Sequence, residues 1–147
     1  MSLQPHGRRL RVGRVSVPDQ VYAVTTVTRD RRAYFSEFLT ARAVVRVLRE
    51  QGDLQRAETL AYVVMPDHLH WLMRLLPGHD LSAVVRDVKA MSSRRIGHRV
   101  WQKGFHDHAL RKEDDVRAWA RYIVANPLRA GLVARVGDYP HWDAAWL

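Results

Sequence analysis

The chain has 147 residues, 47% of them hydrophobic and 27% charged, a composition that predicts one folded domain and excludes overall disorder. It has no cysteine, which excludes disulfides and thiolate metal sites and suits a reducing compartment. Because no apolar run approaches the ~18 residues of a membrane span and no apolar segment of a secretory signal is visible, we expect a cytoplasmic protein that contacts no membrane.

The formal net charge of +9 favours a polyanionic partner, most often a nucleic acid. Of the 24 basic residues, 21 are arginine, whose planar guanidinium makes bidentate contacts with phosphate. Codon bias in a GC-rich genome would also explain the arginine content. It explains the net charge less well.

In chain order, residues 1–18 form a basic arm that precedes residues 19–137, the expected main domain. The arm carries four arginines before the first acidic residue, namely Arg8, Arg9, Arg11 and Arg14. Such an arm could follow a phosphate backbone, or it could be a disordered tail. Both interpretations are open.

Strands and helices then alternate along the chain. Val-, Tyr- and Thr-rich residues 20–28 predict a strand, and an apolar pattern after Ser36 predicts a helix that ends near Gly52. Residues 58–65 and 68–76 predict two strands, and the Pro66–Asp67 turn between them makes a hairpin.

The second half begins with a helix that Asp80 can cap. The basic end of this helix, with Arg94, Arg95 and Arg99, suits the helix dipole and could form a phosphate-facing patch. Residues 104–111 predict a strand. A helix near 114–125 follows and ends before Pro127. Residues 138–147 are aromatic and irregular, and we expect them to pack over the domain as a tail.

The element order β-α-β-β-α-β, followed by a third helix, predicts an α+β fold. It is the ferredoxin-like, split βαβ arrangement, an antiparallel sheet with two helices on one face. The added C-terminal helix could cover part of the open face.

The sequence MPDHLHWLM places His68 and His70 on one face of a strand, about 6–7 Å apart along the chain. Two neutral imidazoles at this spacing can bind a metal ion, but they can also be structural histidines that are hydrogen-bonded in the core. A second pair, His106 and His108, flanks the acidic Asp107. We therefore expect a half-solvated strand there, and a surface or DNA-facing pair in place of a second metal site.

In the third helix, Tyr122 lies roughly 130° from the centre of the apolar stripe, at 100° per residue. Asn126 lies one turn later on the same face as Tyr122. Either the two side chains project together from the helix as a functional pair, or Tyr122 is a half-exposed surface tyrosine and Asn126 a residue that ends the helix.

These motifs together resemble the single-tyrosine HUH transposases of bacterial insertion sequences, in which two histidines flank an apolar residue. The stretches WQKGFHDHALR and YIVANPLRAGLV are most similar to the REP-associated tyrosine transposase branch. The resemblance runs from about Tyr22 to Val133. Asp67 replaces an asparagine that is frequent in the family, and we expect this difference to matter little.

The resemblance implies that Tyr122 is the catalytic nucleophile. It would attack a phosphodiester of single-stranded DNA and leave a free 3′-OH and a 5′-phosphotyrosine. His68, His70 and Asn126 would bind a divalent ion, Mg²⁺ or Mn²⁺. Two imidazoles alone would favour Zn²⁺ or a later transition metal, and the amide and phosphate oxygens move the site toward harder ions.

The resemblance also implies a partner, single-stranded DNA with REP-like hairpins, and a monomer in preference to a dimer. Arginines at the end of the second helix and in the arm could hold phosphates. Trp101, Trp142 and Trp146 could stack bases, although packing in the core or tail is the commoner role of tryptophan.

Two alternatives remain at this stage. One is a non-catalytic ferredoxin-like module that binds single-stranded nucleic acid through aromatic residues on its central strands, although the third strand offers histidines instead. The other is a hydrolase of small phosphoesters, which needs more metal ligands than the sequence offers.

Overall fold

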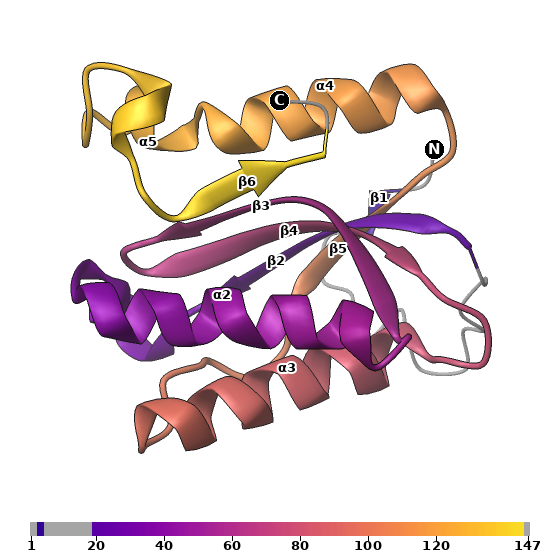
Figure 1. Cartoon of the computed structure of the whole chain (residues 1–147), viewed down its shortest axis with the longest axis horizontal. Helices are drawn as coiled ribbons and strands as arrows, with labels where there is room; N and C mark the ends of the chain where they lie inside the picture. Colours follow the sequence, from indigo (N-terminus) through magenta and orange to yellow (C-terminus); the bar gives the residue numbers. More distant parts are fainter. Residues whose placement is uncertain (1–2, 5–18, 146–147) are drawn as a thin grey trace.

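The computed structural model describes residues 3–4 and 19–145. In this part of the chain, six strands form one antiparallel sheet with the order β1-β5-β2-β4-β3-β6 (Figure 1). The strands are β1 (Leu3–Gln4), β2 (Val21–Val27), β3 (Ala57–Met65), β4 (His68–Leu75), β5 (His106–Leu110) and β6 (Trp142–Ala144). The helices are α2 (Phe38–Asp53), α3 (Leu81–Ile96), α4 (Glu113–Val124) and α5 (Asn126–Arg129).

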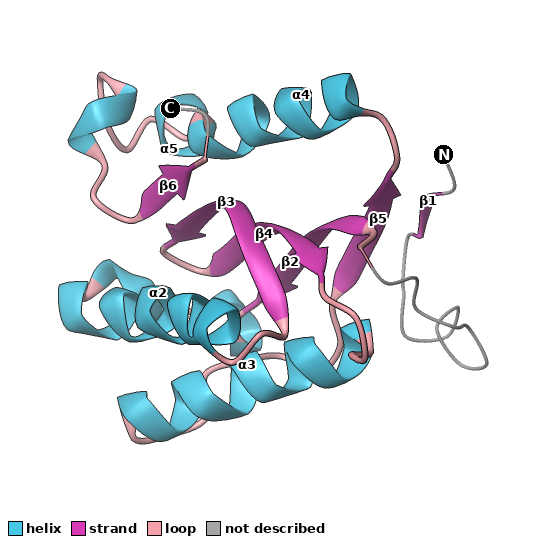
Figure 2. Ribbon diagram, turned by 45° about the vertical axis from the view of Figure 1, so that its right-hand side comes forward, coloured by secondary structure: helices cyan, strands magenta, loops and turns pink. Residues whose placement is uncertain are grey.

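The four central strands, β5-β2-β4-β3, have the order that the ferredoxin-like β-α-β-β-α-β arrangement requires, so the predicted fold class is confirmed. Helices α2 and α3 lie on one face of the sheet, and α4 lies on the other (Figure 2). The third helix therefore covers the face that the first two leave open, as we expected. The result is three layers with the sheet in the middle.

Side-chain alternation along β4 divides the interior into two cores. Leu69, Trp71 and Met73 point into the core beneath α2 and α3. Leu72 points the other way, into a second core with Ile123 of α4. Because alternate residues of a strand share a face, His68 and His70 lie on the α4 side of the sheet. Leu69, only 1% exposed, holds the strand from the opposite side.

The C-terminal segment differs from its expected irregular form, because Trp142–Ala144 pairs with β3 as strand β6. The tail is also tied down by its side chains, since the Tyr139 hydroxyl donates to the Val64 carbonyl at 2.5 Å. Pro140 and Asp143 conceal any strand pattern here. The strand forms because the edge of β3 offers backbone groups that need partners.

The helix ends follow their expected signals. The Asp80 carboxylate accepts a hydrogen bond from the Ala83 N–H at 3.1 Å and caps α3, which ends at Gly97 with a positive φ of 105°. Helix α4 ends before Asn126–Pro127, as predicted, but α5 begins at once, because proline is tolerated in a first helical turn.

Within the described ranges, none of the helices has the length and apolar character that crossing a bilayer requires.

Replacing Leu69 by alanine should lower the free energy of unfolding by about 2–5 kcal/mol, because it leaves a cavity under the histidine-bearing strand. Urea denaturation at neutral pH measures this change. Leu39→Ala is the control, because that side chain is 75% exposed and should change the stability by no more than about 0.5 kcal/mol. Equal losses in the two variants would contradict the packing described for β4.

Candidate active site

His68 and His70 lie side by side on β4, beneath the layer that contains α4. Their ring centroids are 4.8 Å apart, and the ring planes are nearly perpendicular at 86°. Both side chains are partly buried. The sequence-predicted pair is therefore brought together on one face, and the orientation of each ring depends on its neighbours.

Asp67 orients His68. The His68 Nδ1 lies 2.7 Å from the Asp67 Oδ1, and the Arg31 Nε donates to the Asp67 Oδ2 at 3.0 Å. Burial alone would raise the pKa of Asp67, but His68 and Arg31 lower it below its ordinary value. An ionised carboxylate can only accept hydrogen bonds, so Nδ1 of His68 carries the proton. In the neutral form of the ring, the lone pair is then on Nε2.

Thr25 of β2 plays the corresponding part for His70. Its Oγ1 lies 2.9 Å from the His70 Nδ1, across the antiparallel pairing of β2 and β4. Burial lowers the pKa of His70 to about 3, and the positive charges of His68 and Arg129 add to this effect. His70 is therefore neutral at physiological pH. The tautomer that carries its proton on Nδ1 donates to Thr25 and keeps the lone pair on Nε2.

Two imidazoles whose Nδ1 atoms are engaged can offer their Nε2 atoms as donors to a divalent metal ion when both rings are neutral. The described residues contain no group of three or more His, Cys, Asp or Glu side chains that could hold a metal. A third protein ligand from this part of the chain would therefore be an amide, a hydroxyl or a carbonyl oxygen. The donor set fits a site with positions open to substrate, and an oxygen ligand such as an amide moves it toward harder ions.

Tyr122 projects from α4 with 52% of its side chain exposed, which confirms that it lies off the apolar stripe. The guanidinium carbon of Arg129 lies 3.8 Å from the centroid of the Tyr122 ring. The Tyr122 ring also contacts the Trp119 ring edge-on, with centroids 5.8 Å apart. The phenol is thus accessible to a substrate, and two neighbouring side chains hold its ring.

Asn126 is the first residue of α5 and is half-buried. The same short helix carries Arg129, whose charge acts on His70. Asn126 therefore lies on the same short helix as Arg129. No contact joins its amide to either imidazole. Its role as a ligand stays a prediction.

The second histidine pair lies on the more exposed side of its strand, with His106 exposed and His108 half-buried, as expected of a surface pair, but Asp107 between them is fully buried. His106 and His108 lie on the α4 side of the sheet, the side of His68 and His70. Thr25 of β2 pairs with His106 of β5 on one side and with His70 of β4 on the other. The two histidine pairs are therefore two strand spacings, or roughly 10 Å, apart. The His108 ring contacts Trp119, with centroids 5.1 Å apart.

The arginines predicted to bind DNA fall in two places. Arg8, Arg9, Arg11 and Arg14 lie outside the described residues. Arg94 and Arg95 lie at the end of α3, in the layer on the opposite face from the histidines, where Arg95 forms an ion pair with Glu50. Arg99 lies in the connection to β5, which is hydrogen-bonded to β2 at the His68 end of the sheet. Arg94, Arg95 and Arg99 therefore do not form one patch around the histidines.

The tryptophans favour packing over base stacking. Trp101 is buried and donates to the Ser92 hydroxyl at 2.9 Å, and Trp142 donates to the Val136 carbonyl at 3.0 Å. Trp146 lies outside the described residues. Trp119 is partly buried against the core beneath α4, and it also lines a shallow apolar hollow together with Ala118 and Tyr122.

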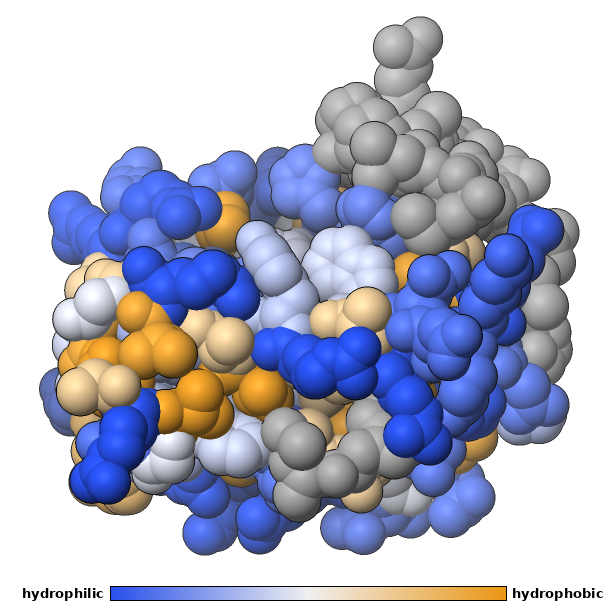
Figure 3. All heavy atoms as spheres, turned by 90° about the horizontal axis from the view of Figure 1, so that it is seen from above, coloured by the Kyte–Doolittle hydropathy of each residue, from blue (hydrophilic) through white to orange (hydrophobic). Residues whose placement is uncertain are grey.

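The surface above α4 is mixed in character. Figure 3 shows it from above, with apolar side chains gathered over the α5 end and hydrophilic side chains over much of the rest. The exposed apolar residues of that end include Leu128 and Leu132.

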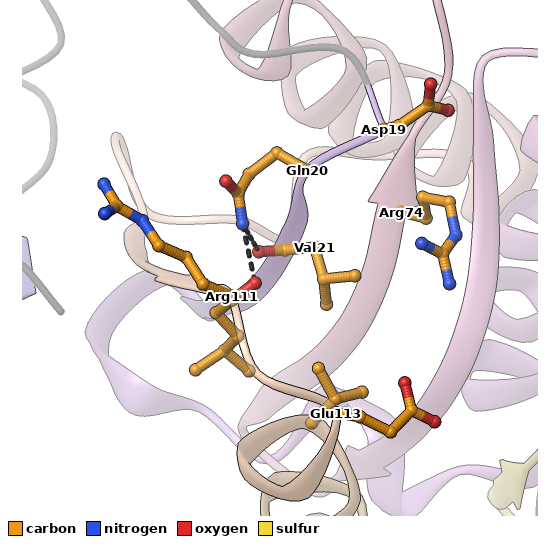
Figure 4. A pocket seen from close by; sticks show the side chains of 8 residues that line it. Asp19, Gln20, Val21, Arg74, Arg111 and Glu113 are labelled. Carbon is orange, nitrogen blue, oxygen red and sulfur yellow. Dashed lines mark hydrogen bonds between the residues drawn. The ribbon is translucent and has the colours of Figure 1, made fainter.

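A separate hollow lies at the other end of β2 and combines arginine with acidic side chains (Figure 4). Arg74 and Arg111 line it together with Asp19 and Glu113, and the Gln20 side chain donates to the Leu110 carbonyl at 2.7 Å. Arg74 is four residues from His70 along β4, roughly 13 Å at the usual strand rise. This hollow therefore differs from the candidate site in its mixed charge and lies at a distance from the histidines.

Sequence reasoning missed three residues of the site: Thr25, Asp67 and Arg129. Asp67 was expected to matter little, yet it is the hydrogen-bond partner of His68. A carboxylate directly before the first histidine was the available signal. The register of β2 and β4 places Thr25 in the site, and the turn into α5 places Arg129 there. Periodicity in the sequence reveals neither of them.

The comparisons with known proteins agree with this geometry. The family model described as "Transposase IS200 like" matches residues 16–126. The chain belongs to this family. A REP-associated tyrosine transposase of Escherichia coli K12 is 34% identical over 109 residues, which are 70% of this chain and 64% of that protein. This chain therefore spans somewhat less than two thirds of that relative.

Further similarity points to the same branch. A Haemophilus influenzae protein assigned to the REP-associated tyrosine transposases is 27% identical over 139 residues, 82% of this chain and 77% of that protein. A solved structure of a REP-associated tyrosine transposase bound to a REP hairpin is 30% identical, with a TM-score of 0.73 over 88% of this chain and 79% of that chain. The family resemblance of the motifs is thereby confirmed.

The buried His70 predicts a pH dependence of stability. Its pKa is lower in the folded chain than in the unfolded chain, so the unfolded chain binds more protons and stability falls as the pH drops below about 6.5. In wild-type protein with a chelator, this histidine should account for a loss of about 2 kcal/mol between pH 7 and pH 5. Urea unfolding of His70→Gln should show that much less pH dependence. An unchanged pH dependence would contradict the burial of a neutral imidazole.

Proposed function

We propose that this protein cleaves and rejoins single-stranded DNA at hairpin-associated sites, with Tyr122 as the nucleophile and a 5′-phosphotyrosine as the intermediate. One observation carries the proposal. An exposed phenol with the Arg129 guanidinium over its ring belongs to the layer that covers the sheet face of His68 and His70, and the charge of Arg129 acts on His70. The transposase family to which the chain belongs supports the same reaction.

In the proposed reaction, the Tyr122 Oη attacks the phosphorus atom of a phosphodiester. The P–O3′ bond breaks, and its electron pair stays on O3′, which takes up a proton while the phenol loses one to solvent. The phosphotyrosine retains a phosphodiester, so a second strand with a free 3′-OH can reverse the step and rejoin the DNA. The exposure of Tyr122 gives the substrate access to the phenol.

We infer that His68, His70 and Asn126 hold a divalent ion, Mg²⁺ or Mn²⁺. When bound, such an ion polarises the phosphate and offsets the charge that develops on it. Asp67 and Thr25 prepare the site by engaging the Nδ1 atoms and leaving Nε2 of both histidines for the ion.

We also infer that the DNA partner contains a folded hairpin, as in the solved relative bound to a REP hairpin. The net charge of +9 suits a phosphate backbone. Bases beside the cleaved bond could stack in the apolar hollow that Trp119 lines. Arg129 contacts Tyr122 and acts on His70 of the same chain, which supports catalysis within a monomer.

The alternative, a non-catalytic module that binds single strands on an open sheet, has less support. Helix α4 packs on the sheet face that such a module would use. The central strand β4 offers His68 and His70 on that face and directs Trp71 into the opposite core. Binding without metal-dependent cleavage of any hairpin substrate would favour this alternative.

The proposal predicts a covalent adduct between the protein and a labelled single strand that carries a hairpin, formed in the presence of Mg²⁺ or Mn²⁺. Tyr122→Phe should abolish the adduct, because it removes the attacking oxygen, while hairpin binding persists. Denaturing gel electrophoresis measures the adduct. Tyr62→Phe, a buried position beneath α2, is the matched control and should keep it. An undiminished adduct in Tyr122→Phe would refute the assignment.

Asp67→Ala should weaken Mn²⁺ binding about 10–100-fold, because His68 loses the partner that orients its ring. Isothermal titration calorimetry measures the affinity without DNA. Asp53→Ala removes an exposed carboxylate at the end of α2 and should leave the affinity unchanged. Wild-type affinity in Asp67→Ala would show that the carboxylate does not prepare the ligand.

A further inference from the structure

Arg129 reaches back from α5 to the residue proposed as the nucleophile. Its Nη2 donates to the backbone carbonyl of Tyr122 at 2.7 Å, and its guanidinium carbon lies 3.8 Å from the centroid of the Tyr122 ring. A hydrogen bond and a cation–π contact thus act on the same guanidinium. The side chain is held in one place although Arg129 is exposed.

The guanidinium is also close enough to His70 to act on it. After burial and His68, the positive charge of Arg129 is the third cause that lowers the His70 pKa. The cation thus contacts the exposed phenol, and its charge also acts on His70. In the described part of the chain, no carboxylate forms an ion pair with it.

An arginine has five N–H donors in a planar fork that matches the oxygens of a phosphate. Among the residues that the structure describes, Arg129 directs one hydrogen bond to the protein, to the Tyr122 carbonyl. The fixed guanidinium thus has donors left for an anion that approaches Tyr122. A phosphodiester is the anion that the proposed reaction brings there.

We propose that Arg129 is a catalytic residue, which binds a non-bridging oxygen of the phosphate that Tyr122 attacks. This inference rests on the proposed function. As the bond from Oη to phosphorus forms and the P–O3′ bond breaks, negative charge grows on the non-bridging oxygens. The guanidinium neutralises that charge, and it does so from a fixed position that needs no rearrangement. The phenol proton leaves to solvent and O3′ is protonated, as before.

The first test measures single-turnover adduct formation on a hairpin strand with Mn²⁺. Arg129→Gln should be about 100-fold slower than wild type, the usual effect of removing one preorganised donor, and Arg129→Lys should be intermediate because it keeps the charge without the fork. A strand with a neutral methylphosphonate at the cleaved position is the diagnostic substrate. On it, the difference between wild type and Arg129→Gln should largely disappear, because no charge is left to neutralise.

Arg121→Gln is the matched control, because Arg121 precedes Tyr122 on α4 and is exposed. Any weaker DNA binding in this variant should affect the phosphodiester and the methylphosphonate strand alike. Wild-type rates in Arg129→Gln would overturn the proposal. So would a loss of equal size on both substrates, because that result would mean that Arg129 only positions the Tyr122 ring.

A second measurement does not depend on cleavage. In Tyr122→Phe protein, the hairpin strand with a phosphodiester at the cleaved position should bind several-fold more tightly than the methylphosphonate strand, by fluorescence anisotropy. Adding Arg129→Gln should remove this preference. A preference that persists in the double variant, or that is absent from Tyr122→Phe itself, would overturn the role of Arg129. Failure of wild type to form an adduct with a phosphodiester would instead refute the proposed function.

Discussion

The alternation of side chains along β4 is the constraint on which the rest of the site depends. The strand is central in the sheet, and its two faces meet different layers. Leu69 and Trp71 are buried beneath α2 and α3, and this packing fixes the register that turns His68 and His70 toward the layer of α4. A shift of one residue would turn both imidazoles into the core beneath α2 and α3 and turn the leucine and tryptophan toward the layer of α4.

Around this strand, the site is assembled from elements that are distant in sequence. Strand β2 supplies Thr25, the turn before β4 supplies Asp67, and α4 and α5 supply Tyr122 and Arg129. Each histidine has a hydrogen-bond partner at Nδ1. The phenol ring contacts the Arg129 guanidinium and the Trp119 ring. The groups that would react are therefore held by neighbours before any substrate arrives, which lowers the cost of organising them during the reaction.

Local patterns in the sequence were sufficient to predict the hairpin, the Asp80 cap and the four central strands, because alternation, turn residues and caps act over short distances. They also predicted that Tyr122 is exposed. They could not predict β6, because its pairing with β3 is a long-range backbone interaction in a segment that contains Pro140 and Asp143. Asp107 was misjudged for a related reason: an acidic residue usually indicates solvent, yet here it is buried.

Arg129 illustrates the limit of helical periodicity. It follows Tyr122 by seven residues, but the chain passes from α4 into α5 at Asn126–Pro127, and a helical wheel drawn across that break has no meaning. The functional assignment of Tyr122, His68, His70 and Asn126 came from motif order and family resemblance. The structure adds the contacts that orient His68, His70 and Tyr122, while the part of Asn126 stays a prediction.

The central claim is that Tyr122 becomes covalently joined to DNA. Trypsin should cut after Arg121 and after Arg129, so mass spectrometry of a nuclease-trimmed adduct can locate the nucleotide on the peptide of residues 122–129. The account predicts that this peptide carries the nucleotide through Tyr122, and only when Mg²⁺ or Mn²⁺ was present during the reaction. A nucleotide attached to any other peptide, or to this one without a divalent ion, would contradict it.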